Sequence, residues 1–105
     1  MTDGDKTLPE AAARAMIRDQ LARLRARSWV ELAALPKSST EDVVVDGVPA
    51  YVTTYVEAPD QDRRWVVVEL CSVGKPVLRV FRMRQCFLDG FEVNPSGESR
   101  SLGDH

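Results

Sequence analysis

The apolar residues of this chain change their spacing near Pro36, and that change constrains the fold more than any other feature of the sequence. Beyond Pro36, apolar and polar residues alternate, which is typical of strands with one buried face. Because the helices come first and no helical crossover separates the strands, the sequence predicts an α+β domain with an antiparallel sheet. Before Pro36, four apolar residues recur every three or four positions, as on one face of an amphipathic helix: Ala13, Ile17, Leu21 and Leu24.

Two capping boxes indicate where the helices begin. Thr7 and Glu10 form the first box, and the apolar stripe that follows predicts a long helix of about five turns. Ser28 and Glu31 form a second box of the same S-x-x-E type. This second box predicts that the helix restarts as a short one over residues 29–35, which Pro36 then ends.

The dipeptide Asp46-Gly47 predicts the first hairpin, because a type I′ turn needs positive φ at both positions and these residues tolerate it. A two-residue turn makes Val45 oppose Val48, so the strands Glu41–Val45 and Val48–Ala58 lie side by side. Alternation then directs a row of valines toward the helix. The face away from the helix receives the intervening residues: Val44, Tyr51, Thr53, Tyr55 and Glu57.

Gly74-Lys75 predicts a second hairpin, between the strand Arg64–Val73 and a long strand that begins at Val77. Asp89-Gly90 predicts a further turn, which precedes a short strand at Phe91–Val93. The meander in this prediction has four or five antiparallel strands. Its second hairpin has a defined register: Leu70 opposes Arg79, Val68 opposes Phe81, Val66 opposes Met83 and Trp65 opposes Arg84.

The chain of 105 residues is long enough for one hydrophobic core, and we expect a single domain over residues 7–95. A disordered N-terminus, 1–6, and a frayed tail, 96–105, are expected on either side of it. The predicted fold class is α+β: a long and a short helix packed on one face of the antiparallel meander sheet, as a two-layer sandwich.

Composition narrows the classes of function. The net charge of −2 argues against a dedicated nucleic-acid or membrane-surface binder. We expect a cytoplasmic protein, because no apolar run reaches the roughly 18–20 residues of a membrane span and the start lacks the features of a signal peptide. The abundance of Ala, Arg and Val points to a bacterial source. Cys71 and Cys86 are not spaced as CxxC, and we expect them to be reduced thiols.

The histidine count excludes several catalytic arrangements. His105, at the last position, is the only histidine, so Ser-His-Asp and Cys-His sites and histidine-based metal sites are not expected. The sequence therefore favours a protein that is not an enzyme and that binds no metal or cofactor. A small-ligand pocket or a carboxylate-based enzyme that uses Glu57 and Glu69 stays open as an alternative.

The predicted sheet face away from the helix has an unusual composition. A solvated sheet face is mostly polar, whereas this one combines aromatic, aliphatic and arginine side chains, a composition enriched at protein interfaces. The sequence therefore predicts a non-catalytic interaction module, which binds a partner protein or a second copy of itself. The residues predicted to form the interaction surface are Tyr51, Tyr55, Trp65, Val67, Val80, Arg82 and Arg84.

Two other interpretations of the same face stay open. In the first, the aromatic and arginine side chains bind single-stranded nucleic acid, although Glu57 and Glu69 on that face would repel phosphates. In the second, the face has no function, because the C-terminal segment with Phe87, Leu88, Phe91 and Val93 folds over and covers it.

Overall fold

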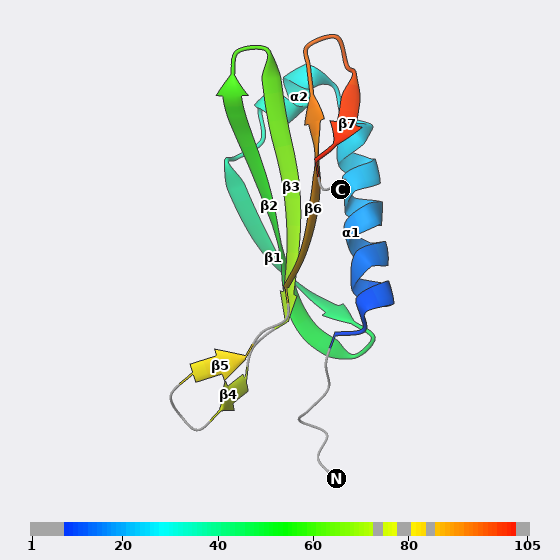
Figure 1. The fold of residues 1–105 in the computed structure, drawn as a ribbon, viewed down its shortest axis with the longest axis vertical. Coiled ribbons are helices and arrows are strands. Elements are labelled where there is room, and N and C mark those ends of the chain that lie inside the picture. The colour runs from blue at the N-terminus through cyan, green and yellow to red at the C-terminus, as the bar shows by residue number, and fades with distance from the viewer. Residues whose placement is uncertain (1–7, 73–74, 78–80, 84–85, 103–105) are drawn as a thin grey trace.

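The computed structural model describes residues 8–72, 75–77, 81–83 and 86–102. Helix α1 packs along one face of a five-stranded antiparallel sheet with the order β1-β2-β3-β6-β7, and β4 and β5 form a separate two-stranded sheet (Figure 1). This arrangement confirms the predicted α+β fold class. The helices are α1 (Glu10–Arg25) and α2 (Trp29–Ala33), and the strands are β1 (Ser38–Val45), β2 (Val48–Asp60), β3 (Arg63–Ser72), β4 (Lys75–Val77), β5 (Phe81–Met83), β6 (Cys86–Val93) and β7 (Ser99–Ser101).

Only the second of the two predicted capping boxes can be followed in the structure. The Ser28 hydroxyl accepts a hydrogen bond from the backbone N–H of Glu31 at 3.2 Å, and the Ser28 N–H donates to Glu31 Oε1 at 2.8 Å. These reciprocal bonds confirm the box and begin α2. Thr7 lies outside the described residues, and Pro9 occupies the N-cap position of α1 without a side-chain cap.

The first hairpin has the predicted turn and register. Asp46 and Gly47 both have positive φ, 50° and 78°, and Val45 opposes Val48. Strand β1 nevertheless starts at Ser38, earlier than the predicted start at Glu41. The alternation that keeps the valines of both strands on one face also predicts the register of β2 with β3, and the structure has it: Tyr51 opposes Cys71, Thr53 opposes Glu69, Tyr55 opposes Val67 and Glu57 opposes Trp65.

The predicted second hairpin is wrong, because the other neighbour of β3 is β6. Val77 belongs to β4, which pairs with β5 outside the main sheet. The pairing seen here directs Phe91 and Val93 to the helix side, where both are buried, whereas the predicted one would have placed Arg79 there. In place of the predicted partners, Val66 opposes Phe91, Val68 opposes Asp89, Leu70 opposes Phe87 and Trp65 opposes Glu92.

Strand β6 runs without interruption through Asp89-Gly90, where a turn was predicted. Glycine is needed there because of a close approach between strands. A Cβ atom on Gly90 would lie 2.6 Å from the carbonyl oxygen of Val66, on the facing part of β3. Beyond β6, the segment 96–105 assigned to a frayed tail contains β7, which pairs with the end of β6.

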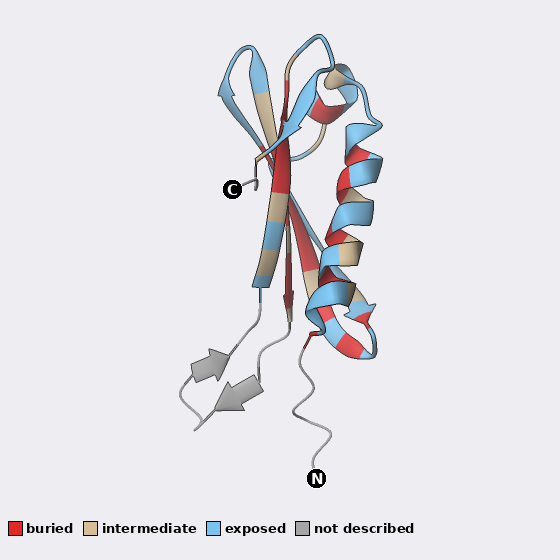
Figure 2. Cartoon of the chain, turned by 45° about the vertical axis from the view of Figure 1, so that its right-hand side comes forward, coloured by how far each residue is buried: buried red, intermediate tan, exposed pale blue. Residues whose placement is uncertain are grey.

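The hydrophobic core lies between α1 and the sheet, as the buried stripe along the helix in Figure 2 shows. The predicted stripe of Ala13, Ile17, Leu21 and Leu24 is buried. Alternation along the strands supplies the other side of the core, and the opposite sheet face is thereby left without a helix. The core residues of the main sheet are Val45, Val48, Ala50, Val52, Val66, Val68, Leu70, Phe91 and Val93.

Candidate functional site: the outer face of the sheet

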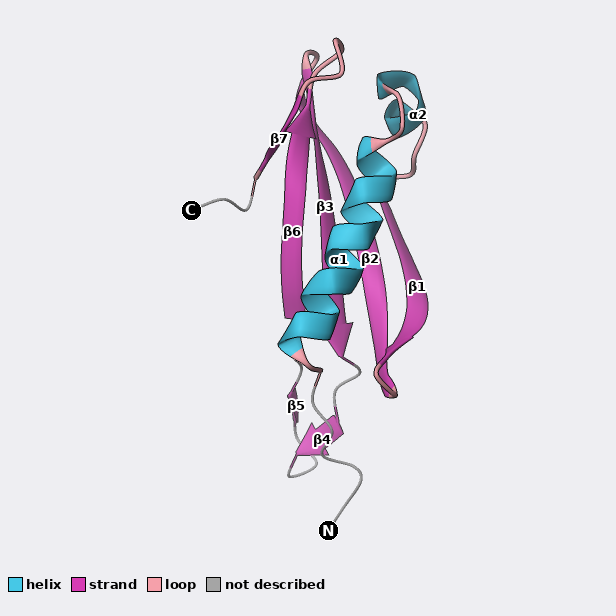
Figure 3. Ribbon diagram, turned by 90° about the vertical axis from the view of Figure 1, so that its right-hand side faces the viewer, coloured by secondary structure: helices cyan, strands magenta, loops and turns pink. Residues whose placement is uncertain are grey.

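The sheet face turned away from α1, called the outer face below, is the candidate site. Among the described residues no helix lies on this side of the sheet (Figure 3). Directly opposed residues of an antiparallel pair share a face, so the strand registers assign its members. They are Ser38, Thr40, Asp42 and Val44 of β1, Pro49, Tyr51, Thr53, Tyr55 and Glu57 of β2, Trp65, Val67, Glu69 and Cys71 of β3, Cys86, Leu88, Gly90 and Glu92 of β6, and Arg100 of β7.

The middle of the outer face exposes large apolar side chains beside the polar residues Thr53 and Glu69. Leu88 has 59% and Tyr55 has 37% of its surface exposed, and Val67 beside Tyr55 is half-buried. Gly90 opposes Val67 on β6, so no side chain rises beside Val67 from that strand. Large apolar side chains exposed together are less common on proteins than single ones, and they often indicate a binding surface.

The structure brings together four of the seven residues predicted for the interaction surface: Tyr51, Tyr55, Trp65 and Val67. Val80 and Arg84 lie outside the described residues, and Arg82 opposes Pro76 in the separate sheet of β4 and β5. The neighbours of Trp65 and Glu69 on the other side of β3 are instead Glu92 and Leu88 of β6. These two residues were missed because the wrong strand was paired with β3.

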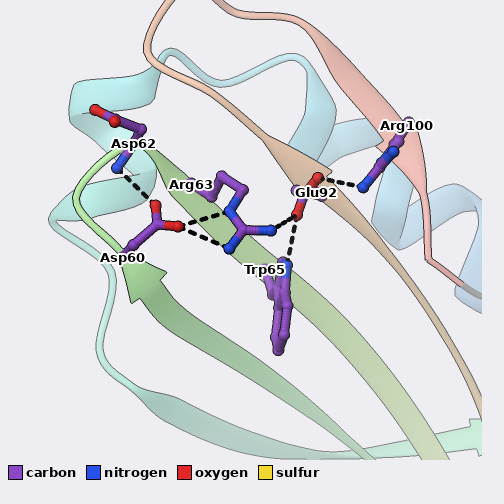
Figure 4. A network of polar contacts seen from close by, with 6 residues as sticks. All are labelled: Asp60, Asp62, Arg63, Trp65, Glu92 and Arg100. Atoms are coloured by element: carbon purple, nitrogen blue, oxygen red, sulfur yellow. Dashed lines mark hydrogen bonds and ion pairs between the residues drawn. The ribbon is translucent and has the colours of Figure 1, made fainter.

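Glu92 is the centre of a polar network at one end of the outer face (Figure 4). The indole N–H of Trp65 donates to Glu92 Oε2 at 2.8 Å, and Arg100 forms an ion pair with Oε1 at 2.9 Å. Arg63 lies 3.3 Å from Oε2. The hydrogen bond from Trp65, followed by the charges of Arg100 and Arg63, lowers the pKa of Glu92, so the carboxylate is held in its ionised form.

The adjoining turn between β2 and β3 fixes the position of Arg63. Asp60 accepts hydrogen bonds from the Arg63 guanidinium at 2.8 Å and from the backbone N–H of Asp62 at 2.8 Å. Both bonds lower the pKa of Asp60, and the bond from Arg63 has the larger effect. Arg63 therefore bridges two carboxylates, Asp60 and Glu92, and its charge is compensated within the chain.

Two further polar contacts lie on the strands of the outer face. The hydroxyl of Tyr55 donates a hydrogen bond of 3.2 Å to Glu69 Oε1, and this bond raises the pKa of Tyr55 because it stabilises the protonated phenol. The hydroxyls of Thr40 and Thr53 are 2.9 Å apart and share a hydrogen bond between β1 and β2. Four polar side chains of the face are thus paired with one another: Thr40 with Thr53 and Tyr55 with Glu69.

The two cysteines form a disulfide, so the prediction of reduced thiols is wrong. Cys71 and Cys86 oppose each other directly across β3 and β6, with their Cα atoms 4.1 Å apart. The positions of the two cysteines in the sequence could have indicated the correct strand pairing. If the two cysteines are placed opposite one another, the antiparallel register that follows also places Val66 opposite Phe91, as the structure has it.

Glu57 and Glu69, on which the carboxylate-based alternatives depend, do not line the cavities that described residues form between α1 and β6, between α1 and β1, or beside Glu92. The cavity between α1 and β6, of about 300 Å³, is lined by arginines that include Arg14 and Arg25, and these two lie over the rings of Phe87 and Phe91. His105 lies outside the described residues.

Residues 86–102, the described part of the C-terminal segment, do not cover the outer face. Phe91 and Val93 point into the core from β6, while Leu88 extends the outer face itself.

Comparison of the chain with protein-family models, with curated proteins and with solved structures finds no match. Neither α1 nor α2, the helices of the described part of the chain, is long and apolar enough to cross a membrane.

Proposed function

We propose that this protein is a non-catalytic interaction module that associates with a second copy of itself through the outer face. The observation that carries the proposal is that apolar side chains lie uncovered in the middle of this face, where Leu88, Tyr55 and Val67 lie on adjacent strands. Burying such side chains against an apolar partner contributes about 25 cal/mol for each Å² removed from water.

The size of the outer face suits a partner that is also a sheet. Strands about 4.8 Å apart that rise about 3.3 Å per residue give four strands of eight residues and the short β7 a projected area of roughly 550 Å². Side-chain relief brings the accessible area closer to the roughly 800 Å² per partner that standard interfaces bury. Two sheets pack well face to face, with about 10 Å between them.

The pairing of charges favours a second copy as the partner. Glu92 is compensated by Arg63 and Arg100, and Glu69 accepts a hydrogen bond from Tyr55. Burial of an uncompensated charge is costly, whereas these groups already have partners within the chain. The carboxylates of Glu92 and Glu69 can therefore be covered by a surface that offers no complementary charge, such as the same face of another copy related by a two-fold axis. The exposed carboxylates of Asp42 and Glu57 stay at the solvated rim of such an interface.

The same contacts disfavour the nucleic-acid alternative. Arg63 is bound to two carboxylates, and Arg64 lies over the ring of Trp29, 4.9 Å from its centroid. Glu57 and Glu69 remain on the outer face and would repel a phosphate backbone. Binding driven by phosphate contacts needs several available cations, because each neutralised phosphate releases counterions.

The test is sedimentation velocity of the full chain over a range of micromolar concentrations. We expect the average mass of the wild type to rise with concentration toward that of a dimer. Leu88→Glu, which places a charge in the middle of the outer face, should remain a monomer. Val30→Glu is the matched control, because Val30 is 74% exposed on α2 and lies outside this face.

Two results would contradict the proposal: a wild type that stays monomeric throughout, or a Leu88→Glu variant that associates as strongly as the wild type. A monomeric wild type that binds a short single-stranded oligonucleotide, with an affinity that falls steeply with salt, would favour the nucleic-acid alternative instead.

A further inference from the structure

We propose that Glu69, Cys71 and Cys86 form a binding site for a thiophilic divalent cation such as Zn²⁺ when the disulfide is reduced. One carboxylate oxygen and the two sulfur atoms of these residues all lie within 4.8 Å of one another. Three protein ligands and one open position is the arrangement in which zinc commonly keeps a water or an external ligand.

The strand geometry explains why the three ligands converge. Cys71 and Cys86 are directly opposed on β3 and β6, and Glu69 lies two positions before Cys71 on the same strand and therefore on the same face. The site is part of the sheet, so reduction alone does not separate its ligands. Cys71 is buried and Cys86 is exposed, which leaves the sulfur of Cys86 accessible to a reductant and to a metal ion.

A second residue orients the carboxylate. The Tyr55 hydroxyl donates its hydrogen bond to Oε1 of Glu69, which leaves Oε2 available to face the sulfurs. Hydrogen bonds of this kind to a metal ligand hold it in position, and their loss typically lowers metal affinity 10–100-fold. Tyr55 therefore acts as a positioning residue for the site.

The chemistry of the ligands selects the class of cation. Two thiolates favour Zn²⁺ and Cd²⁺ over Mg²⁺ and Ca²⁺, which prefer an all-oxygen environment. In the structure the two sulfurs are bonded to each other, so reduction must come first. Two equivalents of a monothiol break the S–S bond and are themselves oxidised to a disulfide, leaving two cysteine thiols. Metal binding then displaces both thiol protons to water.

The test is titration of the full chain with Cd²⁺, followed by the ultraviolet charge-transfer absorption of Cd²⁺–thiolate bonds. The protein is first reduced with a monothiol, which is removed without oxygen. We expect one Cd²⁺ per chain in the reduced protein, displaced by Zn²⁺, and no such absorption in the oxidised protein. The site lies on the outer face, which the proposed dimer would cover, so the titration is done below the concentration range in which the chain associates. Under that condition its failure is distinct from a failure of the proposed function.

Variants that keep both cysteines isolate the contributions of the other residues. Glu69→Gln should lower the affinity for Cd²⁺ by at least about tenfold, and Tyr55→Phe by about tenfold. Glu57→Gln is the matched control, since Glu57 is an exposed carboxylate on the outer face that opposes Trp65, and it should bind as the wild type does.

Three outcomes would overturn the proposal. The first is a reduced wild type without Cd²⁺–thiolate absorption, and the second is a stoichiometry of one Cd²⁺ per two chains. The third is a Glu69→Gln variant with wild-type affinity, which would leave only the two sulfurs as ligands. Far-UV circular dichroism covers the case in which reduction unfolds the chain: refolding on addition of Cd²⁺ supports the site, and no refolding overturns it.

Discussion

Replacement of Gly90 by alanine tests the strand pairing on which the outer face depends. In the structure a Cβ atom at this position would lie 2.6 Å from the Val66 carbonyl oxygen and 3.0 Å from a methyl carbon of Val67. Ordinary van der Waals contacts of a Cβ atom lie between 3.4 and 4 Å, so β3 and β6 must move apart to admit the methyl group. The oxygen belongs to the backbone of a central strand and cannot rotate away.

The expected magnitude follows from this overlap. Insertion of a methyl group into a packed region typically costs about 1–3 kcal/mol. For a domain of this size each kcal/mol lowers the melting temperature by roughly 4–8 °C. We therefore expect Gly90→Ala to melt at least about 4 °C below the wild type when both are followed by circular dichroism in the oxidised state.

The control for Gly90→Ala is Val30→Ala, on α2 and outside the outer face. Val30 is 74% exposed, and substitutions at exposed positions usually change stability by less than about 0.5 kcal/mol. If Asp89-Gly90 were a turn, as its composition indicates, the added methyl group would face solvent. A Gly90→Ala variant as stable as Val30→Ala would therefore refute the pairing of β6 with β3 described here.

Three further predictions concern other parts of the fold. Ser28→Ala removes the hydroxyl that accepts at the start of α2 and should cost about 1 kcal/mol in urea unfolding, with Ser96→Ala in the turn after β6 as a comparison. Phe91→Ala should cost about 3–5 kcal/mol in the same assay, because Phe91 is fully buried; a cost below 1 kcal/mol would contradict its place in the core. The pKa of Glu92 is lowered in the folded state, so its ionised form stabilises the fold above the ordinary glutamate value of 4.5, and this contribution is lost as the pH falls below it. The melting temperature of the wild type should therefore exceed that of Glu92→Gln at neutral pH and approach it in acid, and a difference that does not change with pH would contradict the network.

The parts of the fold that could be predicted are those that depend on neighbours in the sequence. The stripe from Ala13 to Leu24, the box at Ser28 and the turn at Asp46 each involve residues close together in the chain, and the structure has all three features. The β2–β3 register is also as predicted, because a bulge between Glu57 and Asp60 preserves the alternation that the valines require. The outer-face residues of β2 and β3 could therefore be predicted from the sequence.

The remainder of the outer face depends on which segment pairs with the other edge of β3. Sequence motifs for turns do not determine that pairing. The two Asp-Gly dipeptides illustrate the reason. At Asp46-Gly47 the glycine permits positive φ in a hairpin, whereas at Asp89-Gly90 it permits the backbone of β3 to approach. The dipeptide is identical, and only a residue distant in the sequence, Val66, distinguishes the two roles. Because the disulfide joins Cys71 to Cys86 in the same register, a chain with both cysteines replaced by serine would show whether apolar burial alone selects β6. The observed pairing buries Phe91 and Val93, whereas the alternative pairing would turn Arg79 into the core, so we expect apolar burial alone to select β6. Gly90→Ala should therefore still destabilise the chain in which both cysteines are replaced by serine.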